Sequence, residues 1–422
     1  MTSGLIPEVY VLWHPGFANG EALAQRVLGW LRPHGLGPHV FYRSLPAPGA
    51  LPGGLPPPIP GDSRPSLAPG DVARYRRSSL GNLQVVLLLS DAHLIADPAW
   101  RYWINGLAET ATSAKRVILP VALDGTAYNV PAALQSLNFL RPLGVPPQGG
   151  SEIWNADVLA TVTRSLLKQL TETLCDLLLH GDGSGKPPSL PAPDRSKVKI
   201  FLSHAKADGT EPARRIRDYI YGQTQIAAFY DDNDIPYGDL FDDVLNRNVA
   251  GSSQSAALIA IRSARYTDRP WCRRELAQFR RPQQMASSEG QAQFWTLNPV
   301  LVVDALDGCT QTFSIPELGN APTIRWLPGN AHHEELIVTT ALREVLLAAH
   351  HRAVGRKIPS DRDSVVLNWL PDPGTLMYIP AIRSGSAQTV FYPGRDLSGA
   401  ELVTLAEFFP HMSFVSFDRV TP

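Results

Sequence analysis

Short apolar runs that end in small or polar residues and lead into helical patterns recur along this chain of 422 residues. The clearest run covers 198–209 and precedes a helix predicted for 212–221. Further strands are predicted at 226–230, 256–261 and 299–304, and a last amphipathic helix at about 334–352. Strands that alternate with helices predict an α/β domain built on a parallel sheet.

The helix after the third strand carries Trp271 and Glu275, four residues apart. Residues at this spacing lie on one face of a helix, so we expect the Trp271 indole to pack into the domain and Glu275 to face the cleft above the strand. The spacing alone is common, and an exposed helix glutamate is the alternative. The neighbouring patterns favour a functional role for Glu275.

An acidic stretch follows the second strand, between residues 231 and 239. Its glycine and proline residues favour a loop with a fixed path, and its position suits a cover over a bound ligand. The alternatives are contact with a neighbouring domain and an ordinary solvated loop. The residues we assign to loop closure or assembly are Asp231, Asp232, Asp234 and Gly238.

Three motifs follow one another along the second half of the chain: Phe201-Leu202-Ser203-His204, Phe229-Tyr230-Asp231 through Gly238, and Tyr266 through Leu276. In these motifs the chain resembles, over about 197–355, the Toll/interleukin-1 receptor (TIR) domain family. Arg269 departs from the family pattern, since many members carry serine there.

Some members of this family cleave the nicotinamide–ribose bond of NAD with a glutamate at the position of Glu275. The resemblance therefore implies a bacterial NAD glycohydrolase or cyclase that uses NAD as its substrate, with no cofactor and no metal. It implies Glu275 as the catalytic residue. Residues expected to contact the substrate are Ser203, His204, Asp208, Tyr230 and Trp271.

The resemblance also implies self-association, because family members commonly assemble head to tail, and such contacts can form open filaments. We therefore expect an antiphage defence effector that is activated by oligomerisation. A partner protein or a small-molecule signal would trigger this oligomerisation. The alternative is a TIR signalling scaffold or adaptor without enzymatic activity, since one fold can host both behaviours.

The N-terminal part reads as a second, divergent copy of the same domain. Its strand at 9–14 parallels 200–204, and Ala122-Leu123-Asp124-Gly125 recurs unchanged at 305–308. Four residues after Trp100 stands an isoleucine, and four after Trp103 a leucine, so this copy lacks the carboxylate. We interpret it as a degenerate pseudo-domain that scaffolds or regulates the second copy.

These patterns predict tandem flavodoxin-like TIR domains, each a parallel sheet flanked by helices, and a small α/β C-terminal module. In that module we expect strands at 364–370, 376–380, 388–392 and 412–417, and a helix capped by Ser398 and Glu401. The predicted boundaries are 1–180 for the degenerate domain, 181–196 for a Pro/Gly/Ser linker, 197–358 for the TIR domain and 359–422 for the module.

Composition narrows the function further. The formal net charge is −1 and there is no dense basic run, so we expect no direct binding to nucleic acid. Three cysteines without disulfide or metal spacing suit a reducing cytoplasm. Neither a leader peptide nor a membrane span is apparent, so we expect a cytoplasmic protein with no membrane contact. The pairs at 332–333 and 350–351 are interpreted as surface helix residues rather than metal ligands.

Overall fold

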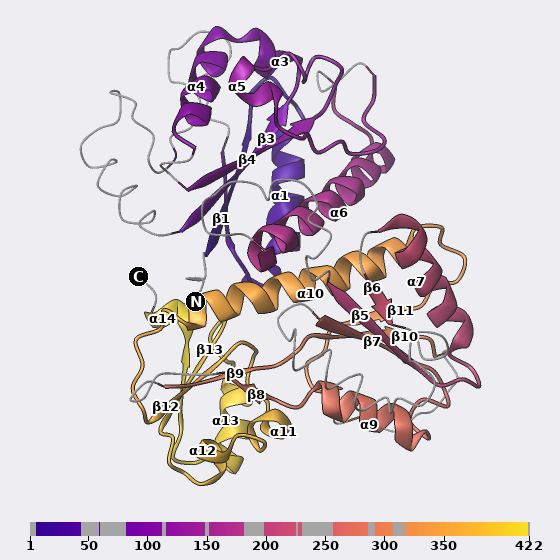
Figure 1. Ribbon diagram of the computed structural model, residues 1–422, viewed down its shortest axis with the longest axis vertical. Helices are drawn as coiled ribbons and strands as arrows, with labels where there is room; N and C mark the ends of the chain where they lie inside the picture. The colour runs from indigo at the N-terminus through magenta and orange to yellow at the C-terminus, as the bar shows by residue number, and fades with distance from the viewer. Residues whose placement is uncertain are drawn as a thin grey trace. The chain divides into compact units, whose positions relative to one another are not determined.

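The computed structural model divides into two compact units, Met1–Pro191 and Ala192–Pro422 (Figure 1). Its parallel sheets are flanked by helices, which confirms the predicted α/β class. The residues that the structure describes are 6–43, 59, 82–111, 115–147, 152–180, 198–224, 227–229, 256–285, 292–306, 315 and 318–420.

The first unit is built on a parallel four-stranded sheet in the order β2-β1-β3-β4. Its central strands are buried on both faces, as parallel strands covered by helices require. The strands are β1 (Pro7–Trp13), β2 (His39–Arg43), β3 (Leu83–Ser90) and β4 (Arg116–Ala122). The helices are α1 (Gly20–Leu31), α3 (Ala92–Ala96), α4 (Pro98–Glu109), α5 (Ala132–Gln135) and α6 (Ala156–His180), with a 3-10 turn at Pro33–Gly35.

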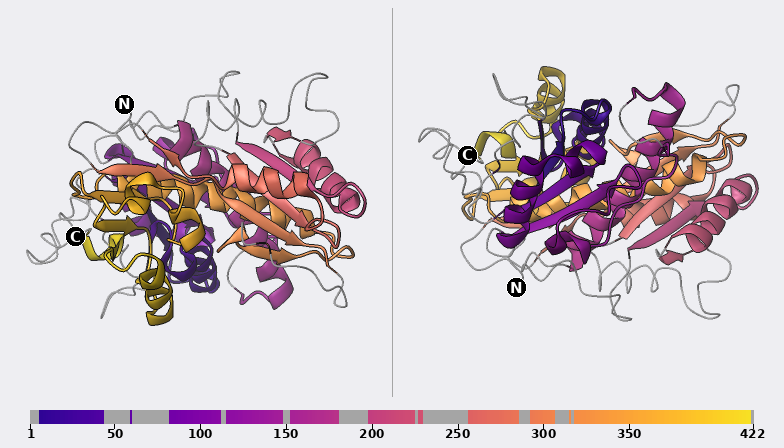
Figure 2. Two further views of the ribbon diagram at one scale, coloured as in Figure 1. Left: turned by 90° about the horizontal axis from the view of Figure 1, so that it is seen from below. Right: turned by 90° about the horizontal axis from the view of Figure 1, so that it is seen from above.

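The second unit contains a parallel five-stranded sheet in the order β11-β10-β7-β5-β6. Helix α9 (Pro270–Phe279) packs on β5 and β7, while α7 (Thr210–Gln223) and α10 (His333–Gly355) cover the other face (Figures 1 and 2). The strands are β5 (Lys199–His204), β6 (Ala227–Phe229), β7 (Ala256–Arg262), β10 (Val300–Asp304) and β11 (Thr323–Arg325), so all four predicted strands are present.

The two sheets share one order of strands. In each, the first strand of the unit lies between the second and the third, and the fourth follows the third. This is the start of the flavodoxin-like order 2-1-3-4-5. In the first unit, Leu140 forms an isolated parallel bridge to Val121 of β4, on the side where a fifth strand would lie. The predicted origin of the first unit as a repeat of the second stays a prediction.

A third sheet in the second unit joins two separate stretches of sequence, in the order β14-β13-β12-β9-β8. Strands β8 (Gln283–Gln284) and β9 (Gln293–Thr296) come from between α9 and β10, inside the stretch predicted as the TIR domain. The other strands are β12 (Ser364–Leu367), β13 (Thr389–Tyr392) and β14 (Ser413–Ser416). The module predicted for 359–422 is thus only part of this sheet.

The helices of this module differ in part from the sequence prediction. Residues 376–380 are not a strand: α11 (Pro373–Leu376) ends and α12 (Pro380–Arg383) begins within this stretch, and each helix has proline in its first turn. Helix α13 (Gly399–Phe408) begins at the predicted capping box, in which Ser398 and Glu401 bond each other's backbone amides. A short helix, α14 (Phe417–Val420), follows β14.

Helix α10 is not the amphipathic surface helix that its sequence predicted. Most of its residues are buried, on all sides of the helix. It packs against α7, β7 and β10 of one sheet and against β12 of the other, so it has no broad solvent-facing stripe. Among the described residues, no helix is both long and apolar enough to span a membrane.

Candidate functional site

The candidate site lies where β5 and β7 end at the carboxyl edge of the sheet and α9 begins. Ligands of open α/β sheets bind at this edge, beside the strands where the order of connection reverses. Proline at the first turn of α9 fixes the helix start, and Cys272, Leu276 and Phe279 turn into the core beneath it. Glu275 shares this buried face, and it is only 6 % exposed.

The Glu275 carboxylate is held by a hydroxyl from β5. Ser203 Oγ donates to Glu275 Oε2 over 2.6 Å, and Ser203 Oγ lies 3.0 Å from the Tyr266 hydroxyl. Ser203 and Tyr266 are as deeply buried as the glutamate. The structure therefore brings together Glu275 and Ser203, which the sequence singled out, and adds Tyr266, which the sequence singled out only as one end of a motif.

Two other predicted site residues tie the surrounding loops together. Asp208, in the loop after β5, accepts from Ser263 Oγ at 2.6 Å and from the Arg265 amide at 2.8 Å, both in the loop after β7. His204 is buried, and its carbonyl accepts from Cys272 Sγ at 3.4 Å. The first turn after β5 is thus fixed against both β7 and α9.

Trp271 does not anchor α9 in the core, contrary to the sequence prediction. Its side chain is 43 % exposed, and the Arg274 guanidinium lies 5.6 Å from the ring centroid. Cys272, Leu276 and Phe279 form the buried stripe of α9, and Trp271 lies about a quarter turn from the centre of this stripe. Trp271 is therefore exposed, although it lies near Glu275 on the helix.

The remaining predicted site residues lie outside the described residues. These are Tyr230 and the loop residues Asp231, Asp232, Asp234 and Gly238. Within the part of the chain that the structure describes, no cluster of three or more His, Cys, Asp or Glu side chains could hold a metal ion.

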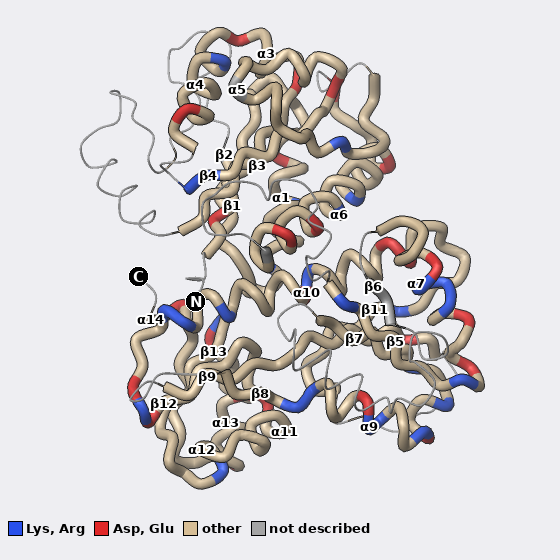
Figure 3. Tube along the Cα trace, in the orientation of Figure 1, with Lys and Arg blue, Asp and Glu red and all other residues tan. Residues whose placement is uncertain are grey.

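Basic residues outnumber acidic ones around α9, and the Cα trace in Figure 3 marks their positions. Exposed arginines lie in the loop before the helix, on the helix and just after it, with the exposed Asp268 among them, whereas Glu275 is buried. These arginines are Arg265, Arg269, Arg273, Arg274 and Arg281. Such a field attracts anions to the edge where the buried carboxylate lies.

The first unit has the same strand order as the sheet of the TIR-like stretch, and comparable strand pairs lie at its centre. Ser203 pairs with Ala260 between β5 and β7, and Leu12 pairs with Leu88 between β1 and β3. Residues 84–104 align with 256–276 without a gap, and both helices start at proline, Pro98 and Pro270.

On the predicted repeat, which stays a prediction, three apolar residues of the first unit stand at the positions of Ser203, Tyr266 and Glu275. They are Leu12, Leu94 and Trp103, and all three belong to one buried apolar cluster.

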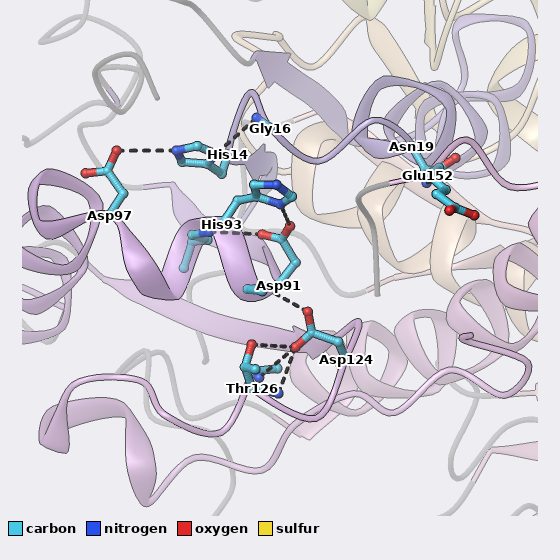
Figure 4. A network of polar contacts seen from close by, with 12 residues as sticks. His14, Gly16, Asn19, Asp91, His93, Asp97, Asp124, Thr126 and Glu152 are labelled. Carbon is cyan, nitrogen blue, oxygen red and sulfur yellow. Dashed lines mark hydrogen bonds and ion pairs between the residues drawn. The ribbon is translucent and has the colours of Figure 1, made fainter. Parts of the chain in front are cut away.

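The same edge of the first unit carries a different polar network (Figure 4). His14 Nε2 lies 3.3 Å from Asp97 Oδ2, and the Gly16 amide donates to His14 Nδ1 at 3.0 Å. His93 Nδ1 lies 2.7 Å from the buried Asp91, which also caps α3. The His14–Asp97 contact joins the turn after β1 to the segment after β3, and the other contacts lie within each turn.

Comparison with known proteins identifies a family for one part of the chain. No curated protein matches the chain. Among solved structures, the crystal structure of tagatose-6-phosphate ketose/aldose isomerase from Escherichia coli is similar over 83% of this chain and 83% of that chain, with 15% sequence identity and a TM-score of 0.24. A likeness this weak carries no argument about fold or function.

The family model of the TIR domain matches residues 200–316. This range holds β5 to β10, α9 and the Ser203–Glu275 pair. The second unit of this chain therefore contains a TIR domain.

Proposed function

We propose that the TIR domain cleaves the bond between nicotinamide and ribose in NAD, with Glu275 as the catalytic carboxylate. The observation that carries this proposal is the buried Glu275 carboxylate, held by Ser203 at the carboxyl edge of a TIR sheet. The TIR family itself is compatible with an enzyme or a scaffold, so the proposal rests on this side chain.

The chemistry suits a single carboxylate. Nicotinamide is cationic in NAD and leaves as a neutral ring, so its departure needs no general acid. The positive charge that grows on the ribose approaches an oxocarbenium ion, which a fixed negative charge in a water-poor site stabilises strongly. Attack by water on the ribose carbon gives linear ADP-ribose, and attack by a nitrogen of the adenine gives a cyclic product.

The surroundings of Glu275 support dinucleotide binding. The exposed arginines around α9 have the charge to attract the diphosphate. Trp271, with its ring partly open to solvent, has a face on which a nicotinamide or adenine ring can stack. We assign substrate contacts to His204, Asp208 and Tyr230 as well. Ser203 belongs to the substrate site because it holds the Glu275 carboxylate.

We further propose that the protein is a bacterial defence effector whose NAD cleavage is switched on by assembly. TIR domains commonly self-associate. The replacement of Ser203, Tyr266 and Glu275 by apolar residues in the first unit favours a scaffold or regulatory role for that unit. In this proposal a partner protein or a small-molecule signal drives assembly, and residues 231–239 contact a neighbouring copy.

The alternative function is a TIR scaffold that recruits other TIR domains without chemistry. The exposed Trp271 favours it, because an aromatic residue with a flanking arginine is a common anchor of protein interfaces.

Turnover of NAD by the full chain and by Glu275→Gln decides between these functions. We expect nicotinamide release by the wild type, rising with protein concentration and with a crowding agent, and a loss on the order of 100-fold in kcat for Glu275→Gln. The matched control is Glu211→Gln, which removes an exposed carboxylate from the first turn of α7. Equal turnover by the wild type and Glu275→Gln rules out the catalytic assignment. Absence of turnover in assembled wild-type protein favours the scaffold.

A further inference from the structure

Tyr266 and Ser203 form a chain of hydrogen bonds that ends on the Glu275 carboxylate. Ser203 donates its single hydroxyl proton to Glu275 Oε2 at 2.6 Å. Ser203 Oγ can then only accept from the Tyr266 hydroxyl, 3.0 Å away. The direction of the second bond follows from the single proton of the Ser203 hydroxyl.

We propose that Tyr266 is a positioning residue for Glu275 that acts through Ser203. This inference rests on the proposed function and gives Ser203 a more specific role within it: Ser203 orients the carboxylate rather than binding NAD directly. Each member comes from a different element: Ser203 from β5, Tyr266 from the loop after β7, and Glu275 from α9. These hydrogen bonds therefore set the distance between α9 and the end of β5 at the Glu275 carboxylate.

Two observations support a joint role for the three residues. All three are buried, and the Tyr266 ring packs in the apolar core beneath α9, so the position of its hydroxyl is fixed by packing. In the first unit, the corresponding Leu12, Leu94 and Trp103 are all apolar. Where the carboxylate is missing, both hydroxyls that would hold it are missing too.

The proposal predicts a particular pattern of kinetics in the full-length protein. Ser203→Ala loses a bond to a charged group and should lower kcat about 10- to 100-fold, and Tyr266→Phe loses a neutral bond and should lower it about 5-fold. KM for NAD should change less than 2-fold in both variants. Because Tyr266 acts through Ser203, the double variant should be no slower than Ser203→Ala. Ser203→Thr, which keeps the hydroxyl, should restore most of kcat.

Two variants control for the loss of a buried hydroxyl in itself. Tyr392→Phe and Ser416→Ala remove buried hydroxyls from the third sheet, where Tyr392 accepts from the Leu397 amide and Ser416 donates to the Gly394 carbonyl. Both should leave kcat unchanged. If Ser203→Ala and Tyr266→Phe multiply in the double variant, or if they raise KM instead of lowering kcat, the positioning role is wrong.

A second measurement does not depend on NAD cleavage. In protein labelled with ¹³Cδ-glutamate, the Glu275 carboxyl resonance is identified by its absence in Glu275→Gln. Its chemical shift should move in Ser203→Ala and in Tyr266→Phe, and stay in place in Tyr392→Phe. A resonance that does not move in either site variant overturns the proposal, even in a chain that cleaves NAD. A resonance that moves in a chain without NAD cleavage supports the positioning and refutes the proposed enzyme.

Discussion

At the scale of single residues, burial separates the two members of the Trp-x-x-x-Glu motif. Glu275 is the buried one, although an isolated carboxylate is costly to bury, and the Ser203 hydroxyl supplies the hydrogen bond that offsets part of this cost. Trp271, which has far more apolar surface to bury, stays on the outside of α9. Folded proteins usually bury tryptophan and expose glutamate. The opposite arrangement here favours a functional role for both residues.

The exposure of Trp271 gives a prediction that separates function from stability. Trp271→Ala should lower the free energy of unfolding by less than about 1 kcal/mol, as for other exposed sites. It should raise KM for NAD if the ring stacks on the substrate. The control is Phe279→Ala on the same helix, where a core aromatic is removed and the loss should be about 3–5 kcal/mol. Denaturant unfolding and NAD kinetics measure the two effects, and a large loss of stability in Trp271→Ala would contradict the placement of its ring.

At the scale of elements, the buried histidines of α10 make the stability of the protein depend on pH. His351 is buried on this helix, with Nδ1 3.2 Å from the Asn368 carbonyl after β12. Burial lowers the pKa of His351 to about 4, against the hydrogen bond to Asn368, which raises it. Burial lowers the pKa of His333, at the start of the same helix, as well. Both histidines are therefore neutral in the folded protein near pH 7.

A histidine with a lowered pKa in the folded state makes the protein less stable in acid. The unfolded chain binds the proton at about pH 6.5 and the folded chain at about pH 4, so the stability is fully present above the first value and is lost as pH falls toward the second. For His351 the loss amounts to about 3 kcal/mol. His351→Gln, which keeps a donor for Asn368, should flatten the fall in stability between pH 7 and pH 4.5.

Urea unfolding at the two pH values measures this slope. The exposed His411→Gln is the control and should keep the wild-type dependence on pH. If His351→Gln falls as steeply as the wild type, then His351 does not carry the acid sensitivity and other groups, such as His333, do.

At the scale of the whole chain, the TIR domain and the C-terminal residues of the second unit are interlocked. Strand β9 pairs with β12, and β8 follows α9 directly. The Arg280 guanidinium, at the end of α9, lies 3.5 Å from Asp372, which caps α11. Burial lowers the pKa of Arg280, and the Asp372 charge opposes this shift. The helix that carries Glu275 is thus tied at its end to the third sheet.

This interlocking predicts which fragments of the chain fold. A fragment of residues 192–422 keeps all partners of β8 and β9 and should give a cooperative unfolding transition. A fragment of 197–358, which follows the domain boundaries read from sequence, removes β12, β13 and β14 and leaves β9 with an unpaired edge. We expect it to aggregate or to lack a cooperative transition in circular dichroism and size-exclusion chromatography. A monomeric, cooperatively folding 197–358 would show that the third sheet is dispensable.

The sequence by itself determined the α/β class, the strands β5, β6, β7 and β10 and the TIR domain, because these depend on local hydrophobic periods and on motifs of adjacent residues. It also singled out Glu275 and Ser203, which lie at strand and helix ends. It did not predict β4 or β11. The sequence analysis predicted a strand at 376–380, because short helices that begin at proline have too few residues to show a helical hydrophobic period. It predicted α10 as amphipathic, because burial of a helix between two sheets is not visible in its local sequence.

Only the tertiary structure decided which of these residues touch. Ser203, Tyr266 and Glu275 are separated by up to 72 residues, and no local pattern states that their side chains meet. The exposure of Trp271 and the membership of β8 and β9 in the third sheet were decided in the same way. Each depends on how distant segments pack, because contact between side chains follows from the geometry of the whole unit, whereas secondary structure follows largely from neighbours in the chain.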